Sequence, residues 1–233
     1  MAQAALIAAA GLLAYGAWRM SQDDTGQDAA AQPAPEDSIA GEWLGTAGDV
    51  LANAGQTAAG FVDNITGGSL KLSNMARVTV ADVNHPNVQA LLRVIRRGEG
   101  TADEAGFRRL FGGELFDGYA DHPRRKITRT LRSGGTITST AAGAFQFLAS
   151  TWDETRNIMK LPDFSPASQT RAAVGRIAAR GALEDAKAGA LNIALKKIAW
   201  EWASMPGSPY GQPVISWETA HATYAAAGGS TYA

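Results

Sequence analysis

The stretch VIRRGEGTADEAGF, residues 94–107, places one glutamate, Glu99, between two glycines directly after an apolar helical run. A carboxyl group at the C-terminal end of a helix is mildly unfavourable against the helix dipole, so helix stability does not account for this residue. The position suits a carboxyl whose pKa is raised so that it stays protonated and can donate to a substrate. Because lone glutamates are mostly surface groups, this stretch alone leaves two interpretations open, a solvated carboxylate and a catalytic acid.

Further carboxylates follow Glu99 in the next part of the chain, and any of them could form a glycosidase-like pair with it. Spacing in the sequence does not select one partner, because the fold decides which side chains meet. The candidates are Asp103, Glu104, Glu114, Asp117 and Asp121.

Other catalytic chemistries have little support in the sequence. The chain has no cysteine, which excludes a disulfide, a zinc–thiolate site and a cysteine nucleophile. The histidines His85, His122 and His221 are far apart and lack the spacing of a metal-binding motif. Neither a phosphate-binding glycine loop nor a serine nucleophile elbow is present. We therefore predict an enzyme without a metal ion or cofactor.

A second set of polar residues lies in the sequence TSTAAGAFQFLASTWDE, which begins at Thr138. Gly143 lets the backbone come close to a ligand. Gln146 offers a hydrogen-bond donor and an acceptor, which suits sugar hydroxyl or acetamido groups. Phe145 lies between them and could face either the core or a ligand. The segment is therefore a candidate for binding a sugar.

The elements that must position these residues follow from the apolar pattern. Helical spacing predicts a helix over residues 86–97, directly before Glu99. Residues 107–140 are rich in Gly, Thr and Arg with short apolar pieces, which predicts irregular strands and loops. A helix, a small β-rich lobe and then more helices make an α+β layout. The later helical patterns cover residues 141–158, 166–181, 183–204 and 214–227.

Four segments are predicted to divide the chain. They are a hydrophobic helix over residues 1–20, an acidic flexible linker over 21–37, a Gly/Ala-rich amphipathic helix and connector over 38–84, and the main domain over 85–233. Within the connector, the alternating sequence ARVTVADV, residues 76–83, predicts a short strand.

The hydrophobic start of the chain carries no charge before Arg19, and Trp18 and Arg19 suit a membrane interface. A helix over residues 2–18 would rise roughly 25 Å, slightly short of a ~30 Å hydrocarbon core. A membrane anchor is therefore favoured, with a signal peptide and a helix packed against other protein subunits as alternatives. A signal peptide normally begins with basic residues, which this start lacks.

Charge is distributed unevenly along the chain. Residues 1–84 contain three lysines and arginines against nine acids, a net charge of −6, whereas residues 85–233 contain eighteen against thirteen, a net charge of +5. A basic C-terminal part indicates an anionic partner, which could be nucleic acid, anionic lipid or a cell-wall polymer. A solvated surface with a mild excess of arginine is the alternative.

Six motifs in residues 85–228 resemble, in the same order, motifs of the lysozyme-like superfamily, and more closely those of the phage lambda endolysin group of murein transglycosylases. Six collinear matches are more specific than any single one. The motifs are GEGT (98–101), FGGELFDGYADHPRR (111–125), STAAGAFQFL (139–148), DFSPASQ (163–169), RGAL (180–183) and WASMPGSPYGQ (202–212).

The resemblance implies a lysozyme-like α+β fold in which a helical lobe and a small β-rich lobe enclose an active-site cleft, with a helical N-terminal extension outside it. It also implies that Glu99 is the single catalytic glutamate. Such enzymes cut the β-1,4 bond between N-acetylmuramic acid and N-acetylglucosamine, and the acid then takes a proton from the muramic acid 6-hydroxyl. The product is a 1,6-anhydro sugar, so one carboxyl is enough and no water is consumed.

The same resemblance implies which residues bind the substrate. Where the family often has Gly-Arg-Tyr-Gln, this chain has GAFQ, so Phe145 cannot form the hydrogen bond of a tyrosine hydroxyl. The glutamine at the end of this motif is kept. The predicted binding residues are Gly143, Phe145, Gln146, Tyr119, His122 and Tyr210.

The sequence therefore predicts a peptidoglycan-cleaving lytic transglycosylase with Glu99 as its catalytic residue. Its predicted partners are the glycan strands and, through the N-terminal segment, a membrane or other virion proteins, with no nucleic acid. The N-terminal extension, which a free lysis enzyme would not need, indicates a virion-associated or membrane-anchored enzyme that opens the cell wall during genome entry. Two alternatives stay open: a hydrolytic muramidase or endolysin for host lysis, with Asp117 or Asp121 assisting, and a structural virion protein with a degenerate domain.

Overall fold

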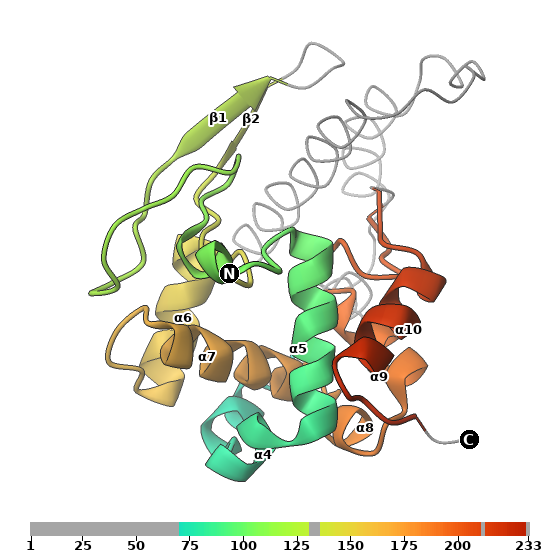
Figure 1. Cartoon of the computed structure of the whole chain (residues 1–233). Coiled ribbons are helices and arrows are strands. Elements are labelled where there is room, and N and C mark those ends of the chain that lie inside the picture. Colours follow the sequence, from blue (N-terminus) through green and yellow to red (C-terminus); the bar gives the residue numbers. More distant parts are fainter. Residues whose placement is uncertain (1–69, 131–135, 211–212, 232–233) are drawn as a thin grey trace, which may run out of the picture.

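The structure, a computed structural model, describes residues 70–130, 136–210 and 213–231 (Figure 1). The predicted hydrophobic helix and acidic linker, residues 1–37, lie outside this part of the chain, as do residues 38–69 of the predicted connector. Within the described residues, no helix is both long enough and apolar enough to span a membrane.

In the described part of the chain, helices dominate and a two-stranded hairpin forms the one regular sheet. This architecture confirms the predicted α+β fold with a small β-rich part. The labels η1 and η2 denote 3-10 helices. In chain order the elements are η1 (Leu72–Arg77), α4 (Val80–Asn84), α5 (Pro86–Glu99), η2 (Glu104–Arg108), β1 (Ile127–Thr130), β2 (Thr136–Ser139), α6 (Ala149–Met159), α7 (Pro166–Ala179), α8 (Leu183–Lys187), α9 (Leu191–Ile198) and α10 (Trp217–Ala226).

Helix α5 carries Glu99 as its last residue, so the predicted helix is confirmed and extends two residues further. Pro86 occupies the first turn, where its missing N–H costs no hydrogen bond. The His85 ring nitrogen Nδ1 caps this turn by accepting a hydrogen bond from the Asn87 N–H at 3.3 Å. The helix packs against α7, α8 and α10. Its buried apolar residues include Val88, Leu91, Leu92 and Ile95.

Strands β1 and β2 pair antiparallel, with Ile127 opposite Ser139. Figure 1 shows this hairpin extending away from the helices, on the side of α5 opposite to α9 and α10. An isolated bridge between Leu110 and Ala142 ties the loop before the hairpin to the turn after it. This irregular pairing agrees with the strands and loops predicted over residues 107–140.

The helix predicted over residues 141–158 begins only at Ala149, so the prediction is wrong for residues 141–148. Here the backbone turns through Gly143 and Gln146, whose φ angles are +81° and +47°. A positive φ is incompatible with a right-handed helix. The predicted sugar-binding segment is therefore a turn and not the first half of a helix.

The helix predicted over residues 183–204 is two shorter helices, α8 and α9, because the chain turns at Gly189 with a φ of +76°. A side chain at Gly189 would collide with the backbone oxygen of Ser230. The close approach of the C-terminal segment thus requires a glycine at this point. The two remaining predicted helices are confirmed as α7 and α10.

The strand predicted over residues 76–83 is also wrong, because η1 ends and α4 begins within it. The Thr79 hydroxyl accepts a hydrogen bond from the Asp82 N–H at 3.1 Å, and the Asp82 carboxylate accepts one from the Thr79 N–H at 3.0 Å. This reciprocal pair is a capping box, a signal for the start of a helix.

Residues 70–84 pack against the helices that follow them. Met75 is fully buried, and the Lys71 N–H donates to the Ala179 carbonyl at 2.9 Å. Lys187 Nζ lies 2.9 Å from Asp82 Oδ1 and so joins α8 to α4. The end of the predicted connector therefore shares the core of the main domain.

Candidate active site

Helix α5 ends in a tight glycine cap that fixes the backbone around Glu99. Gly100 has a φ of +70°, its N–H bonds to the Arg97 carbonyl at 3.3 Å, and the Thr101 N–H bonds to the Arg96 carbonyl at 2.9 Å. This pairing is a Schellman motif, in which the residues after a helix satisfy its last carbonyl groups. The last helical residue is thereby held in one backbone position.

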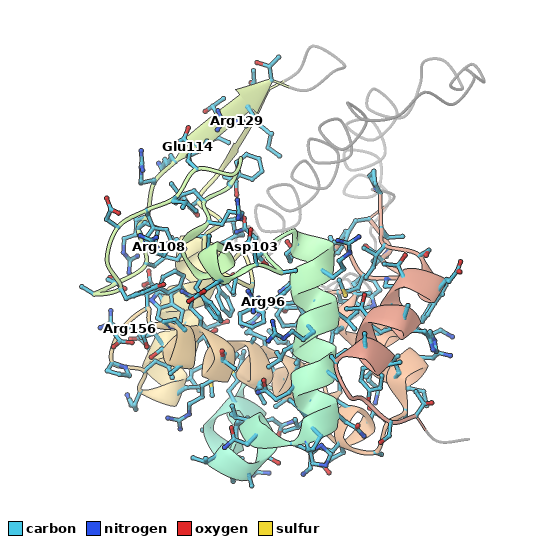
Figure 2. The ribbon with its side chains drawn as sticks, in the orientation of Figure 1. Arg96, Asp103, Arg108, Glu114, Arg129 and Arg156 are labelled. Carbon is cyan, nitrogen blue, oxygen red and sulfur yellow. The ribbon has the colours of Figure 1, made fainter. Side chains whose placement is uncertain are left out.

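The side chain of Arg96 fastens the loop that follows Glu99. Two of its guanidinium nitrogens donate to the Thr101 carbonyl, at 2.7 and 3.0 Å, and one also donates to the Asp103 carbonyl. The guanidinium carbon lies over the Phe107 ring, 4.6 Å from its centroid. Figure 2 shows Arg96 and Asp103 near this end of α5. The loop is therefore tied to the helix that carries Glu99.

The side chain of Glu99 lies inside the protein, and the residue is 1% exposed. Ser204 Oγ donates a hydrogen bond to Glu99 Oε1 at 2.6 Å. This approach depends on Gly98, because a side chain at that position would collide with Met205 and would come within 2.7 Å of Ser204 Oγ. Acidic residues are rarely buried to this extent. Glu99 is the most buried acid in the described part of the chain.

A turn at Ala144 and Phe145 lies against the same helix end. Thr101 Oγ1 donates to the Ala144 carbonyl at 2.5 Å, and Trp202 Nε1 donates to the Phe145 carbonyl at 3.1 Å. Phe145 is 2% exposed, and its ring packs beside Phe147 with 6.1 Å between the centroids. The backbone of Phe145 thus lies at the site while its ring belongs to the core.

Gly143 is required by packing inside the protein, whereas the sequence predicted that it contacts a ligand. A side chain there would collide with the Gln169 amide oxygen. That oxygen accepts the Ala144 N–H at 2.8 Å, and the amide nitrogen of Gln169 donates to the Phe107 and Phe164 carbonyls at 2.9 and 2.7 Å. Gln169, fully buried, therefore holds the turn in place.

Gln146 is buried within this turn, and its orientation is fixed. Its amide nitrogen donates to the Arg109 and Gly143 carbonyls at 3.1 and 2.9 Å. Because both neighbours are acceptors, the nitrogen and not the oxygen must face them. The amide oxygen is buried and has no hydrogen-bond partner in the described part of the chain. An unpaired buried acceptor costs about 1–3 kcal/mol, and a hydroxyl or N–H of a ligand would satisfy it.

His122 is buried, and both of its ring nitrogens bond within the protein. Nε2 lies 2.8 Å from the Phe147 carbonyl oxygen, and Nδ1 accepts the Arg124 N–H at 3.1 Å. Nε2 therefore carries the ring hydrogen and Nδ1 carries none. Burial lowers the pKa of His122 to about 4, so the imidazole is neutral at neutral pH. Neither nitrogen is left to bind a substrate.

Tyr119 and Tyr210 are half-buried and belong to two separate contacts. The Tyr119 ring packs edge-on against Phe116, with 6.4 Å between the centroids. The Tyr210 hydroxyl donates to the Trp200 carbonyl at 3.2 Å, and the two rings pack edge-on at 6.1 Å. Neither of these contacts reaches Glu99.

The other carboxylates considered as partners of Glu99 lie in different surroundings. Asp121 is half-buried, and its carboxylate accepts hydrogen bonds from Trp152 Nε1 at 3.1 Å and Arg156 Nη1 at 3.0 Å. Figure 2 shows Glu114 beside Arg129 on the hairpin side of the molecule. In the described residues, no second carboxyl is buried as Glu99 is. The exposed candidates are Asp103, Glu104, Glu114 and Asp117.

Residues that hold the site together were not singled out from the sequence. Four of them lie within the recognised motifs, which was the available signal, and Arg96 lies two residues before the motif GEGT. Their roles depend on contacts between distant parts of the chain, such as the hydrogen bond of Ser204 to a residue 105 positions earlier. The residues that hold the site together are Arg96, Thr101, Gln169, Trp202 and Ser204.

In the described part of the chain, no group of three or more His, Asp or Glu side chains is arranged to hold a metal ion.

Burial of a neutral His122 makes the stability of the fold depend on pH. The imidazole has its ordinary pKa of 6.5 in the unfolded chain and a pKa of about 4 in the folded one, so the unfolded state binds more protons between these values. We expect the free energy of unfolding to fall by up to about 3 kcal/mol as the pH drops from 6.5 to 4. Urea unfolding at a series of pH values measures this slope.

The variant His122→Gln should lose most of that slope, because an amide does not titrate in this range. The exposed His221, whose Nε2 lies 2.7 Å from Asn192 Oδ1, is the matched control. His221→Gln should keep the wild-type slope. The prediction fails when wild type and His122→Gln show the same dependence on pH.

The region of the chain that is similar to known proteins includes the whole of this site. The sequence model of the Endolysin family matches residues 89–231. The endolysin of Escherichia phage lambda is 36% identical over 148 residues, which cover 61% of this chain and 91% of the relative. The endolysin of Escherichia phage P2 is 36% identical over 157 residues, which cover 62% of this chain and 94% of the relative.

Solved structures show the same similarity. Bacteriophage lambda lysozyme, in complex with a chitohexasaccharide, is 34% identical with a TM-score of 0.58, and the match covers 63% of this chain and 97% of that one. A second structure of the lysozyme from bacteriophage lambda has a TM-score of 0.55 at the same identity and coverage. The residues matched by the family model include Glu99 and every residue predicted to bind the substrate.

Proposed function

We propose that this chain, which belongs to the endolysin family and degrades peptidoglycan, cuts the glycan strands as a lytic transglycosylase with Glu99 as its catalytic residue. The bond cut is the β-1,4 bond between N-acetylmuramic acid and N-acetylglucosamine. One observation carries the proposal: a carboxyl that is 1% exposed sits at a capped helix end, and none of the five carboxylates considered as its partner is buried.

In the first step, protonated Glu99 donates its proton to the glycosidic oxygen as the bond from that oxygen to C1 of the muramic acid breaks. The leaving N-acetylglucosamine thereby gains a neutral 4-hydroxyl. A buried site suits this step, because exclusion of water keeps the proton and the forming charges within the protein.

In the second step, the Glu99 carboxylate takes a proton from the 6-hydroxyl of the same muramic acid, and O6 forms a bond to C1. The product is a 1,6-anhydro sugar, and Glu99 returns to its protonated form. Since the proton given equals the proton taken, no second carboxyl and no water are needed. This balance fits the surroundings of Glu99 better than a two-carboxyl mechanism does.

For substrate binding, we assign the direct contact to Gln146, whose buried amide oxygen lacks a partner in the described part of the chain. A sugar hydroxyl or acetamido N–H would pair with it. Tyr119 and Tyr210 are assigned to outer positions along the glycan strand, while Phe145 and His122 support the site from the core. Support for a glycan ligand comes from bacteriophage lambda lysozyme, which was solved with a chitohexasaccharide.

Mass spectrometry of digested peptidoglycan distinguishes this reaction from hydrolysis. We expect the new muramic acid ends to be 1,6-anhydro sugars. A hydrolytic muramidase would instead give reducing ends, with Asp117 or Asp121 activating water. We favour transglycosylation because the Asp117 side chain is fully exposed and Asp121 is bonded to Arg156 and Trp152. Reducing ends in the wild-type digest would contradict the proposal.

We also propose that the N-terminal extension places the enzyme in a virion, where it opens the cell wall during genome entry. Support comes from the sequence ahead of the family match, which begins at residue 89: a hydrophobic segment, residues 1–20, precedes an acidic linker. Immunoblots of purified virions should detect the protein. Infectious particles that lack it would rule out this role and favour an endolysin that acts in host lysis.

A further inference from the structure

We propose that Ser204 is a positioning residue for Glu99, which orients the carboxyl group and stabilises the carboxylate that forms when the proton leaves. This inference rests on the proposed function, because it assigns a role within the same reaction. It is carried by one buried hydrogen bond and by the backbone that holds both partners.

The hydrogen bond itself is short and shielded from water. Ser204 Oγ lies 2.6 Å from Glu99 Oε1, and the two residues are 7% and 1% exposed. This separation lies in the range of charge-assisted O–H···O bonds, about 2.5–2.7 Å. An ionised carboxylate can only accept, so the hydroxyl must be the donor in that state. The bond therefore favours the charged form and strengthens as the proton leaves.

The hydroxyl is presented by a turn that is fixed on several sides. The Met205 N–H donates to the Trp202 carbonyl at 3.0 Å, and the Ile215 N–H donates to the Ser204 carbonyl at 3.0 Å. Trp202 is itself fixed, since its ring nitrogen donates to the Phe145 carbonyl at 3.1 Å. A side chain held by its own backbone loses little freedom in forming a hydrogen bond, which is the condition for precise positioning.

The helix makes room for this turn at Gly98. A β-carbon there would lie 2.7 Å from Ser204 Oγ and would collide with the end of Met205. Glycine weakens a helix relative to alanine. The close approach of Ser204 explains why a glycine precedes Glu99. The helix and the turn thus both have a backbone that permits the hydrogen bond.

A group that both gives and takes a proton needs such a partner. The hydrogen bond from Ser204 stabilises the buried carboxylate that forms in the first step and so lowers the barrier to proton release. With the hydroxyl bonded to one oxygen, the rotation of the carboxyl about its own bond is also restricted. Ser204 thus acts through Glu99 and need not touch the substrate.

The test is the variant Ser204→Ala of the full chain, measured on soluble peptidoglycan fragments over a range of pH. We expect kcat to fall roughly 10- to 100-fold with KM within about twofold, because orientation and charge stabilisation are lost while binding is kept. The pH above which activity declines should move upward, since loss of the donor makes Glu99 hold its proton more strongly. Ser204→Cys, which keeps a weak donor of similar size, should fall between Ser and Ala.

Ser168→Ala is the matched control. Ser168 is 5% exposed, and its hydroxyl donates to the Asp163 carboxylate at 2.8 Å, so it loses the same kind of bond elsewhere. Its kcat and pH profile should equal those of the wild type. Melting temperatures of all three variants separate effects on folding from effects on the reaction.

Two results would overturn the proposal. One is a Ser204→Ala enzyme with the wild-type kcat and pH profile. The other is an equal loss of activity in Ser204→Ala and Ser168→Ala, with a lowered melting temperature and no shift of either profile, which marks a purely structural role. A wild-type enzyme that yields no anhydro product would instead refute the proposed function, so the two failures are distinguishable.

Discussion

Replacement of Glu99 by glutamine is expected to lower the rate of peptidoglycan cleavage by about a thousandfold or more. Glutamine has almost the same shape and its amide oxygen can still accept the hydrogen bond from Ser204, but it cannot donate a proton to the glycosidic oxygen or take one from the 6-hydroxyl. A positioned acid or base alone contributes roughly 10²- to 10⁴-fold, and here one group does both tasks. Clearing of a peptidoglycan suspension measures the rate.

The variant Glu104→Gln controls for the loss of one negative charge near this helix end. Glu104 is exposed and begins η2, five residues after Glu99, so its replacement should leave the rate unchanged. Both variants should melt within a few degrees of the wild type. Equal clearing by wild type and Glu99→Gln in a zymogram would refute catalysis by Glu99 and would support a structural protein with a degenerate domain.

Replacement of Glu201 by glutamine is expected to destabilise the fold by about 3–5 kcal/mol. The Glu201 carboxylate accepts two hydrogen bonds from Arg176, at 2.6 and 3.0 Å, and another from Arg180 at 3.1 Å. Although burial alone raises the pKa of Glu201, the two arginines lower it overall, so the residue is ionised. Loss of its charge removes a carboxylate that two arginines share, and one of them, Arg176, is 5% exposed and keeps Glu154 at 2.7 Å.

Thermal unfolding measures this effect, with an expected drop in melting temperature of roughly 6 to 20 °C for a domain of this size. Glu184→Gln is the matched control, because the Glu184 side chain is 81% exposed and pairs with Lys187 at 3.1 Å. An exposed pair contributes little, so that variant should melt within about 2 °C of the wild type. Equal melting temperatures of the two variants would show that the buried cluster is not what stabilises this region.

The helix that ends at Glu99 could be predicted because its signals are local. Apolar residues repeat at helical spacing, a proline opens the first turn, and Gly100 adopts the left-handed conformation that ends a helix. The same pattern drew attention to Glu99 as a carboxyl that helix stability does not explain. The resemblance to a known family then added the reaction, which no local pattern contains.

The turn that holds Gln146 could not be predicted in this way. Its alanines and phenylalanines favour a helix locally, but the turn is imposed by distant partners: Gln169 bonds to the Ala144 N–H, and the Arg109 carbonyl accepts the Gln146 amide. Contacts across such separations depend on the tertiary fold and leave no periodic pattern in the sequence. For this reason the helix was predicted to begin at residue 141, whereas it begins at Ala149.

Ser204 was missed for the same reason. It belongs to the recognised motif WASMPGSPYGQ, yet nothing in that motif says which of its residues reaches Glu99. Gly143 and His122 were predicted to bind the substrate, but contacts within the protein account for both residues. Gly143 lies against Gln169, and His122 forms two hydrogen bonds with the backbone. Residue types identified the candidates, but only the fold shows which of them support the site from within the protein and which remain available to bind a ligand.

The central claim is that Glu99 cleaves the glycan strand without the participation of water. Digestion of purified peptidoglycan in water enriched in oxygen-18, followed by mass spectrometry of the fragments, tests this claim most directly. We expect the new muramic acid ends to be 1,6-anhydro sugars, one water lighter than hydrolysis products and free of the label, because O6 of the substrate attacks C1. New reducing ends at muramic acid would contradict the claim, because such an end forms only when water, rather than O6, attacks C1.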